Sequence, residues 1–257
     1  MKKLSGFAIA LALLTFISSC KKDDNKNTNP APTEQKGAVT VEFDHKFGTA
    51  EFALNTTFTT QSSEQLTFTN VRYYITNFKL QKTDGSYWVA PESYYLVDVA
   101  KTNGTLLTIA DVPAGDYKGV SYTIGVDSIR NVSGAQTGAL DPANGMFWSW
   151  NSGYIFMKFE GTSPQASNGS FSYHVGGFSG ANNTIQQNSH AFGATNLQVK
   201  SSATSKIHML VNMQKLFDGE HETIKVATFN MIHVPGANAV KVAENFHHAI
   251  EFGHVHN

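Results

Sequence analysis

Apolar and polar residues alternate with a period of two over much of the chain beyond residue 37. In the first run of this kind, Val39, Val41, Phe43 and Phe47 fall on one face, and polar residues occupy the positions between them. Further alternating runs cover residues 71–82, 87–98, 117–126, 146–160, 171–178 and 206–212. Alternation of this kind predicts β-strands that bury one face.

Turn-forming pairs separate these runs, among them Asp84-Gly85, Asn103-Gly104 and Asn168-Gly169. Helical patterning is scarce: residues 215–217 predict a single turn, and residues 239–251 predict one weak helix. The pattern therefore favours an all-β fold, an antiparallel β-sandwich or a barrel-like relative of it, built as a single domain over residues 38–257.

Two polar stretches, residues 127–145 and 179–196, are predicted to be long loops. Long loops held on a rigid sheet often carry functional residues, although many are merely tolerated.

The first twenty residues have the pattern of a bacterial lipoprotein signal. Lys2 and Lys3 precede an apolar stretch at 4–17, which is too short to span a bilayer, and Ser18-Ser19-Cys20 resembles a lipobox. We expect residues 1–19 to be removed and Cys20 to carry the lipid anchor, with fatty acyl chains such as palmitate. The alternative is a short transmembrane anchor with an incidental cysteine.

Residues 20–37 are predicted to form a lipidated, flexible tether, because they lack large apolar residues and are rich in Lys, Asp, Asn, Pro and Thr. The charged residues 21–24 resemble an export tag that sends some lipoproteins to the cell surface, and ordinary linker charge explains them equally well. The expected location is the outer membrane, on its periplasmic face or at the cell surface.

Composition excludes several classes of function. Cys20 is the single cysteine, so the mature chain has neither a disulfide nor a thiolate metal ligand. Removal of Lys2 and Lys3 leaves 19 − 2 = 17 basic residues against 20 acidic ones, a net charge of −3 with neutral histidines. Because the chain has no basic run, nucleic acid is excluded as a partner. No hydrolase or phosphate-binding motif is present.

Histidine is the residue type with the most promising chemistry, because nine of the ten histidines lie between residues 174 and 256. His254 and His256 fall on the same side of a strand, close enough to bind one metal ion, although a surface histidine tail is an equally good reading. His45 lies on an apolar face between Phe43 and Phe47, which indicates either a core histidine or a ligand that reaches a buried site.

The other histidines are less distinctive. His174 points away from the side that carries Tyr173 and Val175, and it precedes Gly176-Gly177, where another backbone could approach closely. We expect His208 to be structural, and we expect the remaining isolated histidines, His190, His221 and His233, to be solvated.

An aromatic segment, MFWSWNSGYIFMKFEG at 146–161, predicts a strand on which Trp148 and Trp150 share one face. Such residues usually belong to a core in which the indole N–H groups find partners. The alternative is a wall of a cation-binding or redox-active site.

Four segments together resemble a known family: GVDSIRN (125–131), LDPANGMFWSWNSGYIFMKFEG (140–161), FSYHVGG (171–177) and GHVHN (253–257). They are similar to the MbnP-like copper-binding proteins, and 145–161 is the most specific block. The resemblance implies an all-β fold and Cu(I) bound by histidines. It also implies a tryptophan oxidised to kynurenine by a di-haem partner enzyme of the cytochrome c peroxidase type.

Carried over by residue, the resemblance assigns a copper ligand to His174 and the oxidised side chain to Trp150 or Trp148. One position departs from the family: copper-binding relatives have a histidine directly after the Asn of the first segment, whereas Val132 follows Asn131 here. His45, or His254 and His256, would then supply the missing ligand.

These observations favour a lipid-anchored copper-binding protein without catalytic turnover. The first alternative is a surface module that binds a glycan or a protein and has a purely structural aromatic core. The second is an enzyme of unrecognised type.

Overall fold

The structure is a computed structural model that describes residues 34–148 and 153–257. Residues 34–257 form one compact unit. Its strands are β1 (Lys36–Phe47), β2 (Ala50–Glu51), β3 (Thr57–Thr59), β4 (Gln65–Lys82), β5 (Tyr87–Val89), β6 (Tyr94–Asp98), β7 (Leu106–Pro113), β8 (Gly115–Ile124), β9 (Met157–Thr162), β10 (Ser170–Val175), β11 (Gln186–Ala191), β12 (Leu197–Val199), β13 (Thr204–Asn212), β14 (Met231–Ile232) and β15 (Ile250–His256). Its α-helices are α1 (Ser128–Val132) and α2 (Ala237–Ala249), and its 3-10 helices are η1 (Gly138–Leu140), η2 (Pro142–Asn144), η3 (Gly180–Asn182) and η4 (Met213–Leu216).

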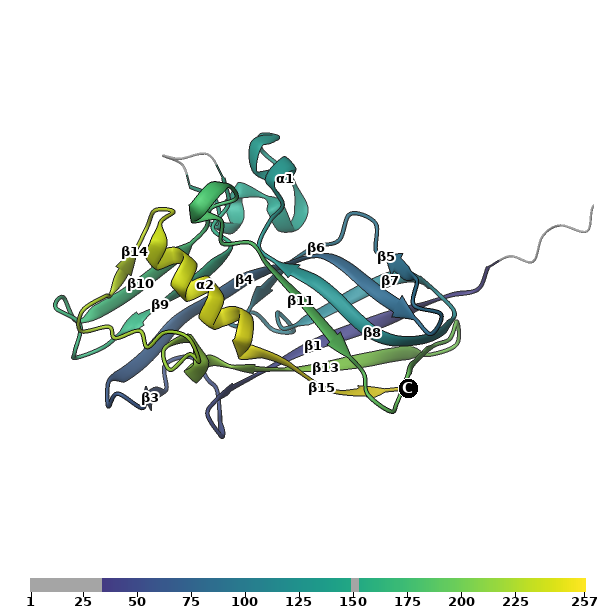
Figure 1. Cartoon of the computed structure of the whole chain (residues 1–257), viewed down its shortest axis with the longest axis horizontal. Coiled ribbons are helices and arrows are strands. Elements are labelled where there is room, and N and C mark those ends of the chain that lie inside the picture. Colours follow the sequence, from purple (N-terminus) through teal and green to yellow (C-terminus); the bar gives the residue numbers. More distant parts are fainter. Residues whose placement is uncertain (1–33, 149–152) are drawn as a thin grey trace, which may run out of the picture. The chain divides into compact units, whose positions relative to one another are not determined.

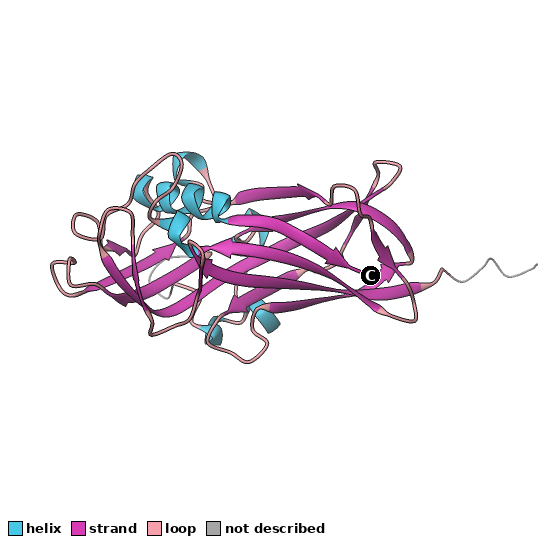
Figure 2. Ribbon diagram, turned by 90° about the horizontal axis from the view of Figure 1, so that it is seen from below, coloured by secondary structure: helices cyan, strands magenta, loops and turns pink. Residues whose placement is uncertain are grey.

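The strands form two sheets. Sheet A has the order β15-β13-β1-β2, and β7 also pairs with β1. Sheet B has the order β11-β8-β4-β9-β10-β14, and the short strands β3, β5, β6 and β12 pair with β4 or β8. The long strand β4 is the centre of sheet B, and the helices are small additions to this body of strands (Figures 1 and 2).

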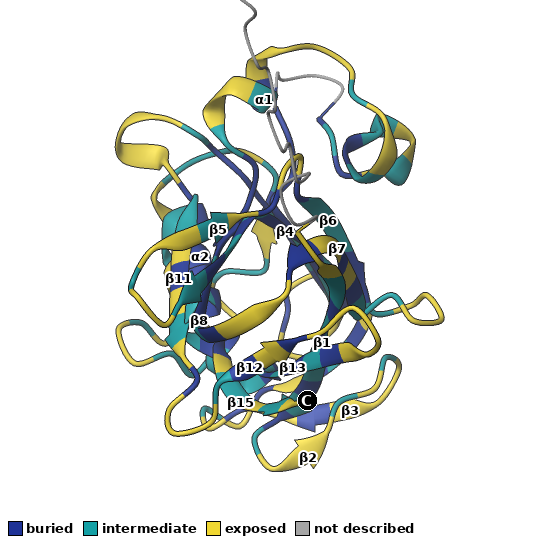
Figure 3. Cartoon of the chain, turned by 90° about the vertical axis from the view of Figure 1, so that its right-hand side faces the viewer, coloured by how far each residue is buried: buried dark blue, intermediate teal, exposed yellow. Residues whose placement is uncertain are grey.

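Aromatic side chains join the inner faces of the two sheets. Phe43 of sheet A meets Tyr73 and Tyr122 of sheet B edge to face, with ring centroids 6.0 and 6.2 Å apart. Buried residues follow the strands, and exposed residues gather in the connections (Figure 3). Edge-to-face aromatic pairs such as Phe43–Tyr73 contribute stability beyond the apolar area that they bury.

Helix α2 closes part of this core. Its buried side chains recur at Ala239, Val242, Phe246 and Ala249, the spacing of one helical face. The Phe246 ring lies 4.9 Å from the rings of both Tyr73 and Phe159, so the helix packs on the inner side of sheet B (Figure 1).

The predicted fold class is confirmed: the protein is an all-β sandwich with barrel-like, strongly curled sheets. The helix expected at 239–251 corresponds to α2, which ends at Ala249, and the turn expected at 215–217 overlaps η4, which ends at Leu216. The sheets are not purely antiparallel, because β1 runs parallel to β13 and β10 runs parallel to β14. Alternation along one strand carries no information on the direction of a distant partner.

Several local predictions are wrong. The expected loop at 127–145 contains the short helices α1, η1 and η2. The expected loop at 179–196 contains β11, whose residues pair with β8 from Gln186 to Ala191. Alternation missed this strand because it is polar, and even its buried residue is Asn188, hydrogen-bonded to the His247 carbonyl at 3.2 Å.

The continuous strand expected at 146–160 is also wrong in its first part, because β9 begins only at Met157. Before β9, the chain folds back on itself. The backbone N–H of Trp148 donates to the Gly153 carbonyl at 3.2 Å, and the backbone N–H of Ile155 donates to the Met146 carbonyl at 2.9 Å. Trp148 therefore does not lie on the strand that carries the rest of the aromatic segment.

Among the described residues, no helix has the length and apolar character needed to cross a membrane.

Candidate functional site

The histidines of the C-terminal half gather in three places. The first, which we call the strand pair, consists of His174 and His233. The second, the tail trio, consists of His208, His254 and His256. The third, the helix-end cluster, consists of His190, His221, His247 and His248. Only His45 stands apart from them.

His45 is a core histidine. Its side chain is inside the sandwich, 6 % exposed, and its Nε2 is hydrogen-bonded to the Tyr73 hydroxyl at 3.1 Å. Burial lowers the pKa of His45 to about 4, an effect that a hydrogen bond with the backbone of Phe43 opposes. Its ring is already hydrogen-bonded within the fold, so His45 is a core histidine, one of the two roles that its place on an apolar face indicated.

The strand pair is formed by the parallel pairing of β10 and β14. Ser172 pairs with Met231 and Tyr173 pairs with Ile232, so His174 and His233 are the next neighbours across the two strands. Their rings stack with centroids 4.6 Å apart and planes inclined by 29°. His233 was expected to be solvated, because no local pattern reveals a partner on a distant parallel strand.

Both rings of the strand pair converge on one hydroxyl group. Ser172 Oγ lies 3.3 Å from His174 Nε2 and 2.9 Å from His233 Nε2. The Glu160 carboxylate lies 2.7 Å from His174 Nε2, and its other oxygen accepts a hydrogen bond from Asn70 at 2.8 Å. The Nε2–H of His174 is thus held by a carboxylate, the arrangement in which the other ring nitrogen of a histidine keeps its lone pair for a metal.

The charges around the strand pair favour this arrangement. The hydrogen bond from His174 lowers the pKa of Glu160 to about 2, with further help from Asn70 and Lys158, so this carboxylate is ionised. Burial and the neighbouring His174 lower the pKa of His233, and a neutral imidazole is the form that coordinates metals.

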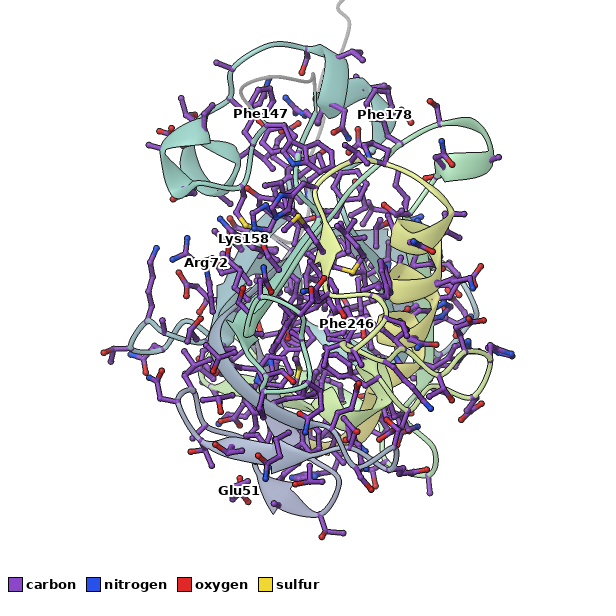
Figure 4. The ribbon with its side chains drawn as sticks, turned by 90° about the vertical axis from the view of Figure 1, so that its left-hand side faces the viewer. Glu51, Arg72, Phe147, Lys158, Phe178 and Phe246 are labelled. Carbon is purple, nitrogen blue, oxygen red and sulfur yellow. The ribbon has the colours of Figure 1, made fainter. Side chains whose placement is uncertain are left out.

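A cavity of about 260 Å³ is lined in part by the segments that follow β10 and β14. Trp148 lines it together with Phe178 and Pro235. Pro235 follows His233 by two residues, and Gly177, which also lines the cavity, follows His174 by three, so both segments run from the histidines to this cavity. Phe178 is labelled at the top of Figure 4, above Lys158 of β9.

Gly176 allows Trp148 to reach this place. A Cβ atom at position 176 would lie 2.8 Å from Cη2 of Trp148 and 2.5 Å from the carbonyl oxygen of Tyr154, closer than real Cβ contacts. The glycines after His174, noted in the sequence for close backbone approach, therefore bring the tryptophan next to the strand of His174.

Asn131 and Val132 show why the family departure matters. The Asn131 amide donates to the Val126 carbonyl at 2.7 Å and accepts from the Tyr154 N–H at 2.9 Å, so it fixes the end of β8 to the aromatic segment. Val132, at the position where copper-binding relatives are expected to carry histidine, is 66 % exposed and has no atom that can bind a metal.

The tail trio lies on the outer face of sheet A. His254 and His208 are opposite each other on β15 and β13, with ring centroids 4.7 Å apart. His254 Nε2 and His256 Nε2 are 2.8 Å apart, as the predicted shared side of the tail strand requires. His208, expected to be structural, is a member of this surface group.

The helix-end cluster is less convergent. His247 and His248 stack as sequence neighbours at the end of α2, with ring centroids 4.6 Å apart. Gln186 holds His247 Nδ1 at 3.1 Å, and the Tyr122 hydroxyl holds His190 Nε2 at 3.2 Å. One nitrogen of each of these two rings is thus hydrogen-bonded, and the two rings do not share a partner as the strand pair does. His190 was expected in solvent but is half-buried, and its burial lowers its pKa.

The ligands predicted for one copper site thus lie in three places. His174 is on sheet B, His254 and His256 are on the outer face of sheet A, and His45 is on the inner face of sheet A. Cys20 and Trp150 fall outside the described residues. In the described part of the chain, no group of three or more His, Cys, Asp and Glu side chains is disposed to hold a metal ion.

Comparison with known proteins gives one family. The MbnP family model matches residues 36–234. Among solved structures, the chain is similar to MbnP from Methylosinus trichosporium, with a TM-score of 0.54 and 16 % sequence identity over 79 % of this chain and 83 % of that one. At this identity the structural match shows a shared fold. No curated protein matches the chain significantly.

Proposed function

Since the chain belongs to the MbnP family, we propose that it is a lipid-anchored copper-binding protein of the cell envelope, without catalytic turnover, whose copper ligands are His174 and His233. The observation that supports this proposal is the strand pair, two stacked imidazoles beside an ionised carboxylate and next to the strand end that Trp148 covers.

The donor set fits copper. Imidazole nitrogen is a good copper ligand, and the mature chain has no thiolate to compete. Glu160 orients His174 and places a negative charge beside the cation, while Ser172 fixes both rings at one point. Two histidines suit the low coordination number of Cu(I). Because Val132 replaces a family histidine, we expect weaker binding than in relatives that have it.

The tryptophans are not copper ligands in this proposal. Trp148 lies at the wall of the cavity that the segments after β10 and β14 line in part. Oxidation of Trp148 or Trp150 to kynurenine by a di-haem partner enzyme is implied by the family resemblance, and copper binding by the two histidines does not require it.

Titration of Cu(I) into the full chain tests the ligand assignment. The protein is prepared without a histidine tag, solubilised in detergent and kept anaerobic, and a chromogenic Cu(I) chelator competes for the metal. We expect one site in the wild type, and a loss of affinity of about tenfold or more in both His174→Ala and His233→Ala, because each removes a ligand.

Two variants control this experiment. Ser172→Ala keeps both imidazoles and removes the hydroxyl between them, so it should bind more weakly than wild type but more tightly than either histidine variant. His221→Ala, at an exposed position of the helix-end cluster, should bind as wild type does. Wild-type affinity in both His174→Ala and His233→Ala would contradict the assignment.

Anchoring through Cys20 is tested by fractionation. In Cys20→Ser the protein should leave the membrane fraction, because the thiol that accepts the lipid is gone and the sequence of residues 21–37 has no large apolar residue to replace it. Incorporation of a labelled fatty acid into wild type and not into Cys20→Ser is the matching result. A wild-type protein that stays on membranes without label would contradict lipidation.

A further inference from the structure

The tail trio lies on the opposite sheet from the strand pair and shares no residue with it. Strand β15 runs along β13 at the edge of sheet A and ends the chain, and Figure 3 shows this end of the protein. His254 and His256 are exposed, and they project from the same side of β15 as their one-residue gap requires. A cation in solvent therefore has free access to both.

The separation of the two tail nitrogens matches that of two ligands on one cation. His254 Nε2 and His256 Nε2 are hydrogen-bonded to each other at 2.8 Å, so one of the two nitrogens carries a proton. Two nitrogens at about 2.05 Å from an ion lie about 2.9 Å apart when they subtend a right angle, and about 3.3 Å apart at a tetrahedral angle. The spacing of the two nitrogens is therefore close to that of two ligands at the right angle that Ni²⁺ and Cu²⁺ prefer.

His208 and Asp44 face the pair from neighbouring strands. His208 stacks with His254, and its Nδ1 is buried without a hydrogen-bond partner among the described residues. Its Nε2 lies 3.7 Å from the Asp44 carboxylate, which is too long for a hydrogen bond. A third imidazole therefore lies beside the tail pair, and a negative charge lies beside that imidazole.

A β-bulge creates this grouping. The register between β13 and β15 shifts between His208 and Met209, and Gly253 is the extra residue on β15. A Cβ atom at position 253 would lie 2.9 Å from His208 Nδ1. The absence of a side chain at Gly253 lets the His208 ring lie against β15 beside His254.

We propose that His254 and His256, assisted by His208, form a second metal site, which binds a divalent cation of borderline softness such as Ni²⁺, Cu²⁺ or Zn²⁺. The two tail imidazoles already bring their Nε2 atoms within the span of one cation, and both can bind it once the donor ring carries its proton on Nδ1. As the described side chains stand, His208 and Asp44 do not converge with them on one point, so a rotation of the His208 ring completes the site.

Calorimetric titration with NiCl₂ in a non-coordinating buffer tests this site on the detergent-solubilised full chain. Wild type should bind one Ni²⁺, and the double variant His254→Gln/His256→Gln should bind it about tenfold more weakly or worse, because both ligands are lost. His208→Gln should have a smaller loss. Glutamine is chosen because it keeps the side-chain size at these surface positions.

The control variant is His247→Gln/His248→Gln, which removes two adjacent histidines from a different surface. It should keep wild-type affinity for Ni²⁺. Equal losses in the two double variants would show diffuse binding by a histidine-rich surface and would overturn the proposal, as would wild-type affinity in His254→Gln/His256→Gln.

The two metal sites can fail independently. His254→Gln/His256→Gln should leave Cu(I) affinity at the strand pair unchanged, and His174→Ala should leave Ni²⁺ affinity unchanged, because the two sites lie on different sheets. A loss of both metals in both variants would mean one shared site and would contradict this assignment.

Discussion

Lowering the pH from 8 to 5 should reduce the free energy of unfolding by about 2 kcal/mol through His45 alone. His45 is buried, and its pKa falls from 6.5 to about 4 in the folded protein because charge is disfavoured inside the sandwich. The unfolded chain therefore takes up a proton at a pH at which the folded protein does not, which favours unfolding.

The free energy of unfolding falls as the pH is lowered through the range between the unfolded and the folded pKa values of His45. The contribution of His45 to stability is complete above pH 6.5 and is lost as the pH falls toward 4. Burial also lowers the pKa values of His190, His233 and His247, which add to the loss in the same direction. Glu160 acts at lower pH, because its pKa is lowered from 4.5 to about 2.

Urea unfolding at a series of pH values, with a chelator present to remove metal effects, measures this loss. His45→Gln should be less stable than wild type at pH 8 but should lose about 2 kcal/mol less between pH 8 and pH 5. Tyr73→Phe removes the hydrogen bond to His45 and keeps its burial, so it should retain the wild-type pH dependence. If His45→Gln loses as much stability as wild type over this range, His45 is not the source.

Alternation predicted the strands that bury one face against the core, such as β1, β4, β8 and β13, because their apolar residues are spaced by two. It could not predict β11, which is polar, or the parallel pairing of β10 with β14, which depends on packing between distant segments. The pattern of apolar residues therefore predicts which strands are buried on one face, but it does not predict which strands pair with each other.

The candidate sites divide in the same way. The His254–His256 contact was predictable, because a gap of one residue on a strand fixes a shared side. The His174–His233 contact was not, because it depends on the parallel register of two strands. The sequence left two roles for His45, a core residue or a metal ligand. The burial of His45 and its hydrogen bond to Tyr73 show that it is a core residue.

Replacement of Glu64 by alanine should lower the free energy of unfolding by about 3 kcal/mol. Glu64 is 4 % exposed, and its two carboxylate oxygens accept hydrogen bonds from the backbone N–H groups of Val226 and Ala227 at 2.8 and 2.9 Å. Alanine would leave both N–H groups without this acceptor, the Val226 one in a buried place, and would leave a cavity where the carboxylate was.

Glu64 also links stability to the strand pair, because the segment that it holds leads through residues 228–230 into β14 and His233. Urea unfolding at pH 8 measures the loss of stability. Glu64→Gln keeps the shape and one carbonyl acceptor, so it should lose about half as much stability as Glu64→Ala, while the exposed Glu244→Ala should stay within about 0.5 kcal/mol of wild type.

Because β14 positions one of the two proposed copper ligands, Cu(I) affinity should fall in Glu64→Ala even where the protein is fully folded. A Glu64→Ala protein as stable as Glu244→Ala would show that the Val226 and Ala227 N–H groups find other partners and that Glu64 does not anchor this segment.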